Sequence, residues 1–331
     1  MSEQKQNRKF IDSIQILRLI AAFFVILVHC EITLSGAFAP DMFFVISGFI
    51  IFYTTDNESK IKGFLPKRFI RLIPLYWIIT IFTYCILLVK PQLSIMSEPT
   101  PEYLIKSLFF IPFVNSKGIN FPIACIGWTL NYEILFYILF FVSILISFKY
   151  RFWIVSALTL CLFYLGKIFG ANNFYLTYWS DSVILDFIFG ACTYFIIFKF
   201  EKILFSKFGK FFCVIIFIAS WIWILGSFGN GIERGFRFGF PSALIFLSSY
   251  VLFIDFKFPK FLILIGNMSY SVYFIEYFTT AVYKLFRTNS IFINVILFIL
   301  MLIVTYLISW YSYILIEKKL SEKLTYFVVK K

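Results

Sequence analysis

Two ionisable residues share one long apolar stretch near the start of the chain. His29 is the only histidine, and Arg18 precedes it by eleven positions in the same stretch. Because an ionisable residue at membrane depth costs roughly 2.5 to 3.5 kcal/mol on insertion scales, the pair indicates a functional site. Eleven helical residues place both side chains on one face, ~16.5 Å apart along the axis. A neutral imidazole is suited to general-base catalysis, and a guanidinium is suited to binding an anion.

Other polar residues fall at a similar depth in their own apolar stretches. In each predicted span, one end is expected at the outer membrane face, as is the end of the first span that carries His29. Ser47, Glu133 and Glu276 lie about six to nine residues from that outer end. These depths are all ~8 to 13 Å on a helix. Because lipid offers no hydrogen-bond partner, the common depth favours a shared cavity. Gly48, beside Ser47, is predicted to be a point of close packing between helices.

A second group of cations precedes the third apolar stretch. Arg68 and Arg71 are three residues apart, so on a helix they share a face and form a fork suited to phosphate. Tyr76 and Trp77 follow at the depth of an interfacial aromatic belt. On these residues alone, a positively charged stop with an aromatic anchor is the simpler interpretation. Arg18 would add a third guanidinium and favours an anion site.

The composition defines the elements that must position these residues. Of 331 residues, 61% are hydrophobic and 14% are charged, and the mean hydropathy is +0.90. A soluble domain has about half apolar and a quarter charged residues, so we predict an all-α, polytopic transmembrane helical bundle. We expect one membrane domain over residues 1–331, with no separate soluble domain. Its ten predicted spans lie near 11–34, 42–56, 72–90, 127–147, 152–169, 182–199, 211–228, 239–255, 262–284 and 289–315.

The distribution of Lys and Arg predicts the orientation of these spans. If the N-terminus is cytoplasmic, the cytoplasmic segments hold 21 of these residues and the outer segments hold 8. The positive-inside rule therefore predicts that both termini are cytoplasmic, in a multi-pass protein of a bacterial-type cytoplasmic (inner) membrane. The net charge of +13 is then explained by cationic loops that face anionic lipid. A nucleic-acid partner is not expected.

The six cysteines show no CxxC or paired spacing. They are typical of small buried hydrophobic residues, and we predict no metal site. Arg18 interrupts the first apolar stretch, which argues against a cleaved signal peptide.

Five motifs occur in a fixed order along the chain. They are Arg18-x10-His29, Asp41-x5-Ser47-Gly48-Phe49, Arg68-x2-Arg71-x2-Pro74-x-Tyr76-Trp77, Trp128-x2-Asn131-Tyr132-Glu133-x2-Phe136-Tyr137 and Gly266-Asn267-x-Ser269-Tyr270-Ser271-x-Tyr273. Their order and spacing resemble the acyltransferase-3 family of integral membrane acyltransferases. Members of that family modify O-antigens, capsules, exopolysaccharides and some small molecules. The resemblance extends from about residue 10 to residue 316.

The resemblance implies an acyl donor, usually acetyl-CoA, that enters from the cytoplasm, and a glycan or glycolipid acceptor presented toward the outside. His29 would then be the general base, and Glu133 would orient the imidazole, stabilise its cation or bind the acceptor. The phosphates of coenzyme A would lie on the arginines already described: Arg18, Arg68 and Arg71. Candidates for the oxyanion or the acceptor are Asp41, Ser47, Asn131, Tyr132 and Glu276.

The chain departs from the family pattern at one position. Many relatives read Ser-Tyr-Ser-x-Tyr-x-x-His, whereas this chain has Glu276 at the last position. His29 is therefore the only imidazole available, and whether Glu276 replaces the missing histidine is left open.

Several alternatives remain open at this stage. Ionisable residues at membrane depth also mark secondary transporters and flippases, although the two halves of the chain show no internal repeat. A non-catalytic scaffold for polysaccharide assembly would need neither His29 nor Arg68. Within the enzyme class, the acceptor could be a peptide, a small molecule or a lipid, and the donor could carry a succinyl group. The loops 91–126 and 229–238 are candidates for the acceptor entrance.

Overall fold

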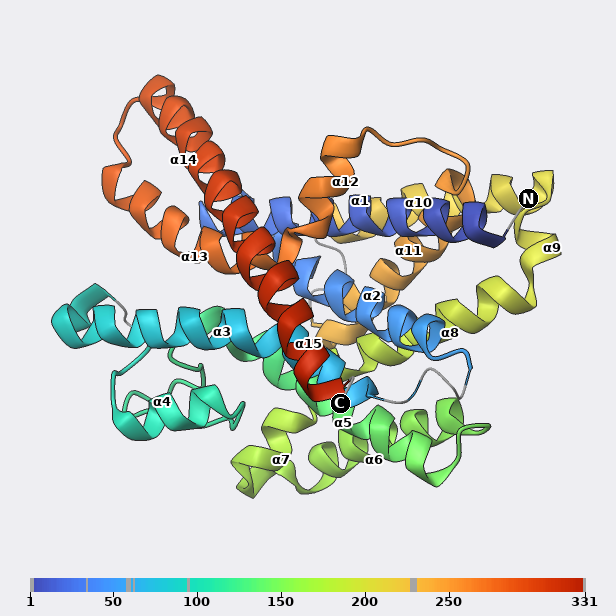
Figure 1. Cartoon of the computed structure of the whole chain (residues 1–331), viewed down its shortest axis with the longest axis horizontal. Coiled ribbons are helices and arrows are strands. Elements are labelled where there is room, and N and C mark those ends of the chain that lie inside the picture. Colours follow the sequence, from blue (N-terminus) through green and yellow to red (C-terminus); the bar gives the residue numbers. More distant parts are fainter. Residues whose placement is uncertain are drawn as a thin grey trace. The chain divides into compact units, whose positions relative to one another are not determined.

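The computed structural model describes residues 3–33, 35–57, 61, 63–93, 96–226 and 231–329. Every regular element within these ranges is a helix (Figure 1). The prediction of an all-α fold is therefore confirmed. Four lysines used in predicting the orientation, Lys60, Lys62, Lys330 and Lys331, lie outside the described residues, as do parts of both candidate entrance loops.

Nine stretches of the described chain are helical, long and apolar enough to cross a membrane, and a bent helix pair brings the total to ten. The prediction of a polytopic protein is thus confirmed. The nine stretches are Asp12–His29, Gly36–Thr54, Phe64–Val89, Cys125–Ile146, Arg151–Asn172, Phe174–Lys199, Lys207–Leu225, Gly235–Phe253 and Ile291–Val328.

The predicted continuous span 262–284 is wrong in one respect, because the structure breaks it into two helices. α12 (Lys260–Asn267) and α13 (Ser269–Phe286) meet at an angle of 71°. Gly266 lies beside the bend: a Cβ there would come within 2.0 Å of the Gln15 carbonyl oxygen, so only glycine allows this close packing of α12 on α1. The polypeptide turns immediately afterwards. Hydropathy measures the composition of a segment and not its direction, so it could not show the break.

The chain forms two compact units, which are described separately below. The first contains residues 1–57 and 182–306, and the second contains residues 58–181 and 307–331. The helices of the first unit are α1 (Glu3–His29), η1 (Ser35–Phe38), α2 (Ala39–Thr54), η6 (Ser182–Ile184), α8 (Leu185–Lys199), α9 (Glu201–Leu204), α10 (Lys207–Leu225), η7 (Gly235–Gly239), α11 (Phe240–Phe253), α12, α13 and most of α14 (Ile291–Ser312).

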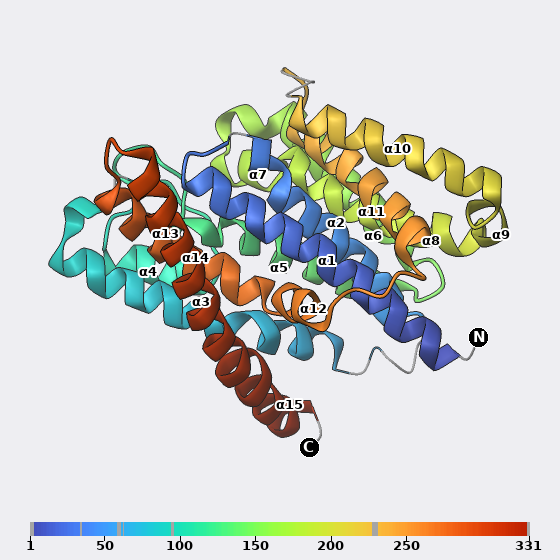
Figure 2. The ribbon, with the colours of Figure 1, turned by 90° about the horizontal axis from the view of Figure 1, so that it is seen from above.

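Close backbone contacts hold the first unit together. α2 packs along α8, α10 along α11 and α1 along α12, as Figure 2 shows for the last two pairs. At Gly48 on α2, a Cβ would come within 2.1 Å of the Phe187 carbonyl oxygen. The predicted role of Gly48 in close packing is therefore confirmed. In this unit α1 is a continuous helix, so Arg18 and His29 do lie on one element, as predicted.

The second unit contains α3 and the helices of residues 91–181, together with the C-terminal helices. Its helices are α3 (Phe64–Val89), η3 (Pro91–Leu93), α4 (Pro101–Leu108), η4 (Cys125–Gly127), α5 (Trp128–Ile146), α6 (Arg151–Phe169), η5 (Gly170–Asn172), α7 (Phe174–Trp179), η8 (Tyr313–Leu320) and α15 (Ser321–Val329). α3 begins eight residues before the predicted span, so Arg68 and Arg71 are helical, as the phosphate-fork hypothesis requires.

Tyr76 and Trp77 on α3 hold the C-terminal end of α4 through hydrogen bonds. The Tyr76 hydroxyl donates to the Ser107 carbonyl oxygen at 3.0 Å, and the Trp77 indole donates to the Leu108 carbonyl oxygen at 2.9 Å. Both acceptors belong to the last turn of α4, where carbonyl groups lack partners within the helix. Tyr76 is fully buried, whereas Trp77 is 39% exposed. Their depth in a membrane stays a prediction. The Tyr76 ring supports α4 from inside the unit.

Candidate active site

His29 occupies the last turn of α1, where the helix stops abruptly. Glu31 adopts a left-handed backbone conformation, with φ of 59°. The Glu31 and Ile32 amides then donate back to the Val28 and Leu27 carbonyl oxygens at 2.9 and 3.0 Å. This turn satisfies carbonyl groups at the helix end. Because the helix C-terminus carries partial negative charge, it stabilises the imidazolium that forms when a neutral ring at this position accepts a proton.

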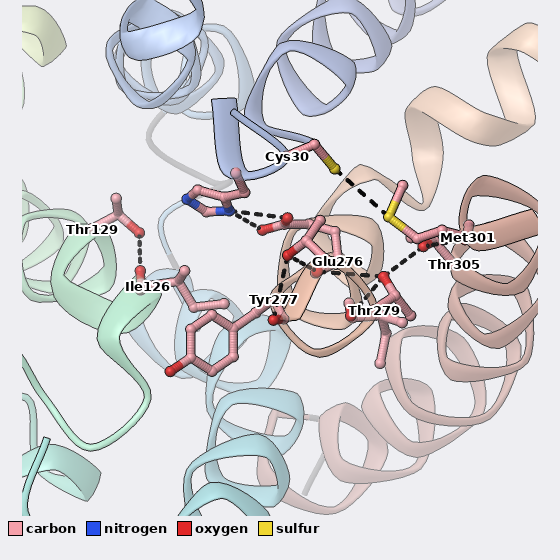
Figure 3. Close-up of polar contacts among 11 residues, drawn as sticks. Cys30, Ile126, Thr129, Glu276, Tyr277, Thr279, Met301 and Thr305 are labelled. Atoms are coloured by element: carbon pink, nitrogen blue, oxygen red, sulfur yellow. Dashed lines mark hydrogen bonds and ion pairs between the residues drawn. The ribbon is translucent and has the colours of Figure 1, made fainter. Parts of the chain in front are cut away.

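The side chain of His29 is held by Glu276 from α13. The His29 Nδ1 atom lies 2.8 Å from Glu276 Oε1 and 3.0 Å from Oε2 (Figure 3). The Glu276 side chain is fully buried, whereas the His29 side chain is 36% exposed. A buried carboxylate is costly unless it is paired and hydrogen-bonded. Glu276 therefore depends on His29 as much as His29 depends on Glu276.

The helix that carries Glu276 is itself fixed by hydroxyl groups. Thr280 donates from Oγ1 to the Glu276 carbonyl oxygen at 2.7 Å. Thr279 and Thr305 share a hydroxyl–hydroxyl hydrogen bond of 2.7 Å, which joins α13 to α14 (Figure 3). The buried Cys30 thiol donates to the Met301 sulfur at 3.8 Å, which joins the end of α1 to α14. The hydrogen bonds of Thr279 and Thr280 limit the movement of the Glu276 carboxylate relative to the imidazole.

The geometry assigns different roles to the two imidazole nitrogens. A carboxylate only accepts hydrogen bonds, so an ionised Glu276 requires the proton of the neutral ring to be on Nδ1, which donates to it. The lone pair is then on Nε2, which makes no hydrogen bond to any residue that the structure describes. A carboxylate on one nitrogen and an open lone pair on the other is the arrangement of a general base in acyl transfer.

Glu133, the partner that the sequence favoured for His29, belongs to the second unit. There its Oε1 atom accepts a short hydrogen bond from the Tyr137 hydroxyl, one turn further along α5. The Arg68 guanidinium lies 5.8 Å from the centroid of the Tyr137 ring and 5.6 Å from that of the Phe64 ring. Within this unit Arg68 also interacts electrostatically with Arg71 and Glu133. Two cations and one carboxylate leave excess positive charge, which suits an anionic ligand.

Asn131 and Tyr132 are committed to contacts inside the second unit. Asn131 Nδ2 donates to the Tyr178 hydroxyl at 2.9 Å, and the Tyr132 hydroxyl donates to the Tyr178 carbonyl oxygen at 2.6 Å. The two tyrosine rings stack with centroids 5.3 Å apart. Asn131 and Tyr132 are buried, and the Asn131 Oδ1 atom has no hydrogen-bond partner among the described residues.

Asp41 forms a buried ion pair in the first unit. Arg234 donates from Nη2 to Asp41 Oδ2 at 2.7 Å and from Nε to Oδ1 at 3.2 Å. Its Nη2 atom also donates to the Ala37 carbonyl oxygen at 2.9 Å. Asp41 is fully buried, and the side chain of Asp186, which is also buried, interacts with it. The two partners are 193 positions apart, so local sequence pattern could not predict this pair.

The remaining candidates also have places in the structure. Arg18 is buried within the first unit, and Ser47 is half-buried on α2. The structure thus brings His29 and Glu276 together in the first unit and Arg68, Arg71 and Glu133 together in the second. Among the described residues, no group of three or more His, Cys, Asp or Glu side chains could hold a metal ion.

The Asp41–Arg234 pair makes a prediction about stability. Arg234→Met should lower the free energy of unfolding by about 3–5 kcal/mol, because it leaves Asp41 buried beside Asp186 without its cation. Thermal unfolding of the purified protein in detergent measures this. The double variant Asp41→Asn/Arg234→Met should regain part of the loss. Glu102→Gln, which removes the exposed pair with Lys106, should cost at most about 1 kcal/mol. An Arg234→Met protein as stable as the parent would contradict the assignment.

Comparisons with known proteins place the chain in a family. The family model described as "Acyltransferase domain" matches residues 11–314. The exopolysaccharide production protein ExoZ of Rhizobium meliloti (strain 1021) is 35% identical over 159 residues, which cover 47% of this chain and 49% of that protein. Acyltransferase MdmB of Streptomyces mycarofaciens is 26% identical over 115 residues, which cover 33% of this chain and 29% of that protein.

The match therefore covers less than half the length of either curated relative. No solved structure matches the chain significantly. The family model nevertheless covers nearly the whole sequence, including all five motifs. The chain belongs to the acyltransferase family whose domain spans residues 11–314.

Proposed function

We propose that this multi-pass membrane protein transfers an acetyl group from acetyl-CoA to a hydroxyl of a cell-surface polysaccharide or its lipid-linked precursor. The observation that carries the proposal is the orientation of the sole histidine: buried Glu276 holds Nδ1, and Nε2 is left open. The printed name of ExoZ, an exopolysaccharide production protein, supports a polysaccharide acceptor. The cytoplasmic membrane, with both termini inside, is the proposed location.

His29 removes and returns one proton in the proposed reaction. Nε2 accepts the proton of the acceptor hydroxyl as the hydroxyl oxygen attacks the carbonyl carbon of the acetyl thioester. Glu276 and the C-terminus of α1 stabilise the resulting imidazolium. The carbon–sulfur bond then breaks, and Nε2–H protonates the departing thiolate of coenzyme A. The products are the acetyl ester and the free thiol, so no net proton is consumed.

Glu276 is proposed to act as the positioning residue for this base. A carboxylate at position 276 holds the Nδ1 proton and compensates the positive charge that forms on the ring. A second histidine at this position would offer no fixed negative charge. The departure from the family pattern thus acquires a physical role, and Glu133 is not needed as the orienting acid.

The donor-binding part of the proposal rests on Arg68 and Arg71 in the second unit. Their shared helix face and the excess positive charge around Glu133 suit the phosphates of coenzyme A. Rings of Phe64 and Tyr137 flank the Arg68 guanidinium and restrict its orientation.

His29→Ala should reduce acetyl transfer by roughly 10²- to 10⁴-fold, the usual contribution of a general base. Glu276→Gln should cause a smaller loss, because the amide oxygen can still accept from Nδ1 but carries no charge. The assay measures incorporation of the acetyl group of labelled acetyl-CoA into surface glycan by purified protein, which also separates an enzyme from a transporter.

Cys30→Ala is the matched control for these variants. It changes the neighbour of His29, but the Cys30 thiol contacts Met301 and not the imidazole. We expect Cys30→Ala to transfer acetyl at close to the normal rate. Near-normal turnover by a folded His29→Ala protein would exclude His29 as the base.

Arg68→Gln should raise the KM for acetyl-CoA by roughly tenfold or more while leaving acceptor preference unchanged, because a charge-assisted hydrogen bond is worth about 1.5–3 kcal/mol. Initial rates at varied acetyl-CoA concentration measure the change. Lys67→Gln, an exposed cation on the preceding position, serves as control. Equal KM values for Arg68→Gln and Lys67→Gln would rule out the phosphate role.

A further inference from the structure

Three charged side chains meet where α1 and α13 end. Glu31 Oε1 lies 2.9 Å from the Lys284 Nζ atom, and Glu31 Oε2 lies 3.4 Å from Arg287 Nη1. The side chains of Lys284, Arg287 and Glu31 are 42%, 45% and 63% exposed. One carboxylate therefore forms ion pairs with two cations, and all three side chains remain accessible to solvent. We call Glu31, Lys284 and Arg287 the charged triad.

Stability does not account for the triad well. Exposed ion pairs typically contribute about 0–1 kcal/mol, so the fold gains little from two of them. Cations near the end of α13 do complement its helix dipole, but one would suffice. By the orientation expected from the loop charges, the triad faces the outside, where Lys and Arg are normally sparse. Two cations beside each other on this face therefore point to a functional use.

The triad adjoins the proposed catalytic pair. Glu31 follows His29 by two residues, and Lys284 lies on α13 about two turns beyond Glu276. Lys284 interacts electrostatically with both His29 and Glu276. Lys284 also lowers the pKa of Glu31, mainly through their hydrogen bond, so Glu31 stays ionised and keeps both cations in place. The triad is therefore close enough to the pair for Lys284 to act on both of its members.

We propose that Lys284 and Arg287 form a subsite for an anionic group on the acceptor, and that this group takes the place of Glu31 when it binds. The anion is a sugar carboxylate of an acidic glycan or the diphosphate of a lipid-linked precursor. Both present oxygens that an ammonium and a guanidinium bind through charge-assisted hydrogen bonds. This inference rests on the proposed function and adds the chemical class of its acceptor.

A binding experiment without acetyl-CoA tests the subsite separately from catalysis. Fluorescent hyaluronan hexasaccharide supplies uronate carboxylates, and fluorescent chitohexaose is the uncharged comparison. Binding is measured by fluorescence anisotropy of the detergent-purified protein in low salt. Either the uronate probe binds roughly fivefold to tenfold more tightly than chitohexaose, or farnesyl diphosphate, but not farnesol, displaces the bound probe. The first result identifies the carboxylate as the anion, and the second identifies the diphosphate.

Variants connect the preference to the triad. Lys284→Gln/Arg287→Gln should abolish the preference for the anion, and Glu31→Gln should strengthen anion binding because the competing carboxylate is gone. Lys106→Gln, which removes a cation paired with Glu102 in the other unit, should change neither. Salt at 0.5 M should weaken binding of the anionic probe by screening.

Two results would overturn the subsite: no preference for either anion over its uncharged counterpart, or a preference that survives Lys284→Gln/Arg287→Gln. Acetyl transfer that depends on His29 would stand in both cases. Conversely, triad-dependent anion binding by a protein that transfers no acetyl group would retain the subsite and reject the proposed function.

Discussion

The buried carboxylate of Glu276 is the constraint on which the rest of the first unit depends. A charge removed from water is costly unless a partner and hydrogen bonds compensate it, and here the partner is the only imidazole in the chain. The two groups meet only if α1 ends at His29 and α13 follows a separate axis from α12. The left-handed turn at Glu31 and the bend beside Gly266 provide these two conditions.

Charge in the first unit is handled in two physically different ways. In the Asp41–Arg234 pair the carboxylate is fully buried, and the bidentate guanidinium also donates to the Ala37 carbonyl, so the pair fixes the backbone around the start of α2. The charged triad is exposed, so replacing its ion pairs by contacts with water or a ligand costs little free energy. His29 is 36% exposed, with one nitrogen held by a buried group and the other open. This partial exposure suits a proton carrier.

The parts of the structure that depend on local pattern could be predicted from the sequence. Apolar length predicted the helices and the membrane class, and residue spacing predicted that Arg18 shares a helix with His29 and Arg68 with Arg71. The pairing of side chains distant in sequence could not be predicted. His29 and Glu276 are 247 positions apart, and equal depth in the membrane made Glu133 just as reasonable a partner. The same holds for Asp41 and Arg234.

The sequence did contain one usable signal for the bend in the predicted ninth span. Gly266-Asn267 is typical of a helix end, but it lies inside a run that is otherwise apolar enough to span a membrane. The prediction of a span over 262–284 relied on its apolar content and not on these two residues. A Gly-Asn pair near the start of an apolar run is therefore informative when a polar residue such as Glu276 follows it.

The protonation of the single histidine tests the central claim most directly. Because no other histidine contributes signal, ¹⁵N-histidine labelling gives the NMR spectrum of His29 alone in the detergent-purified protein. At the pH of maximal transfer, the account predicts a proton on Nδ1, an unprotonated Nε2, and loss of the hydrogen-bonded Nδ1–H signal in Glu276→Ala. A proton on Nε2 in the resting protein, in either the other neutral tautomer or the imidazolium, would contradict it.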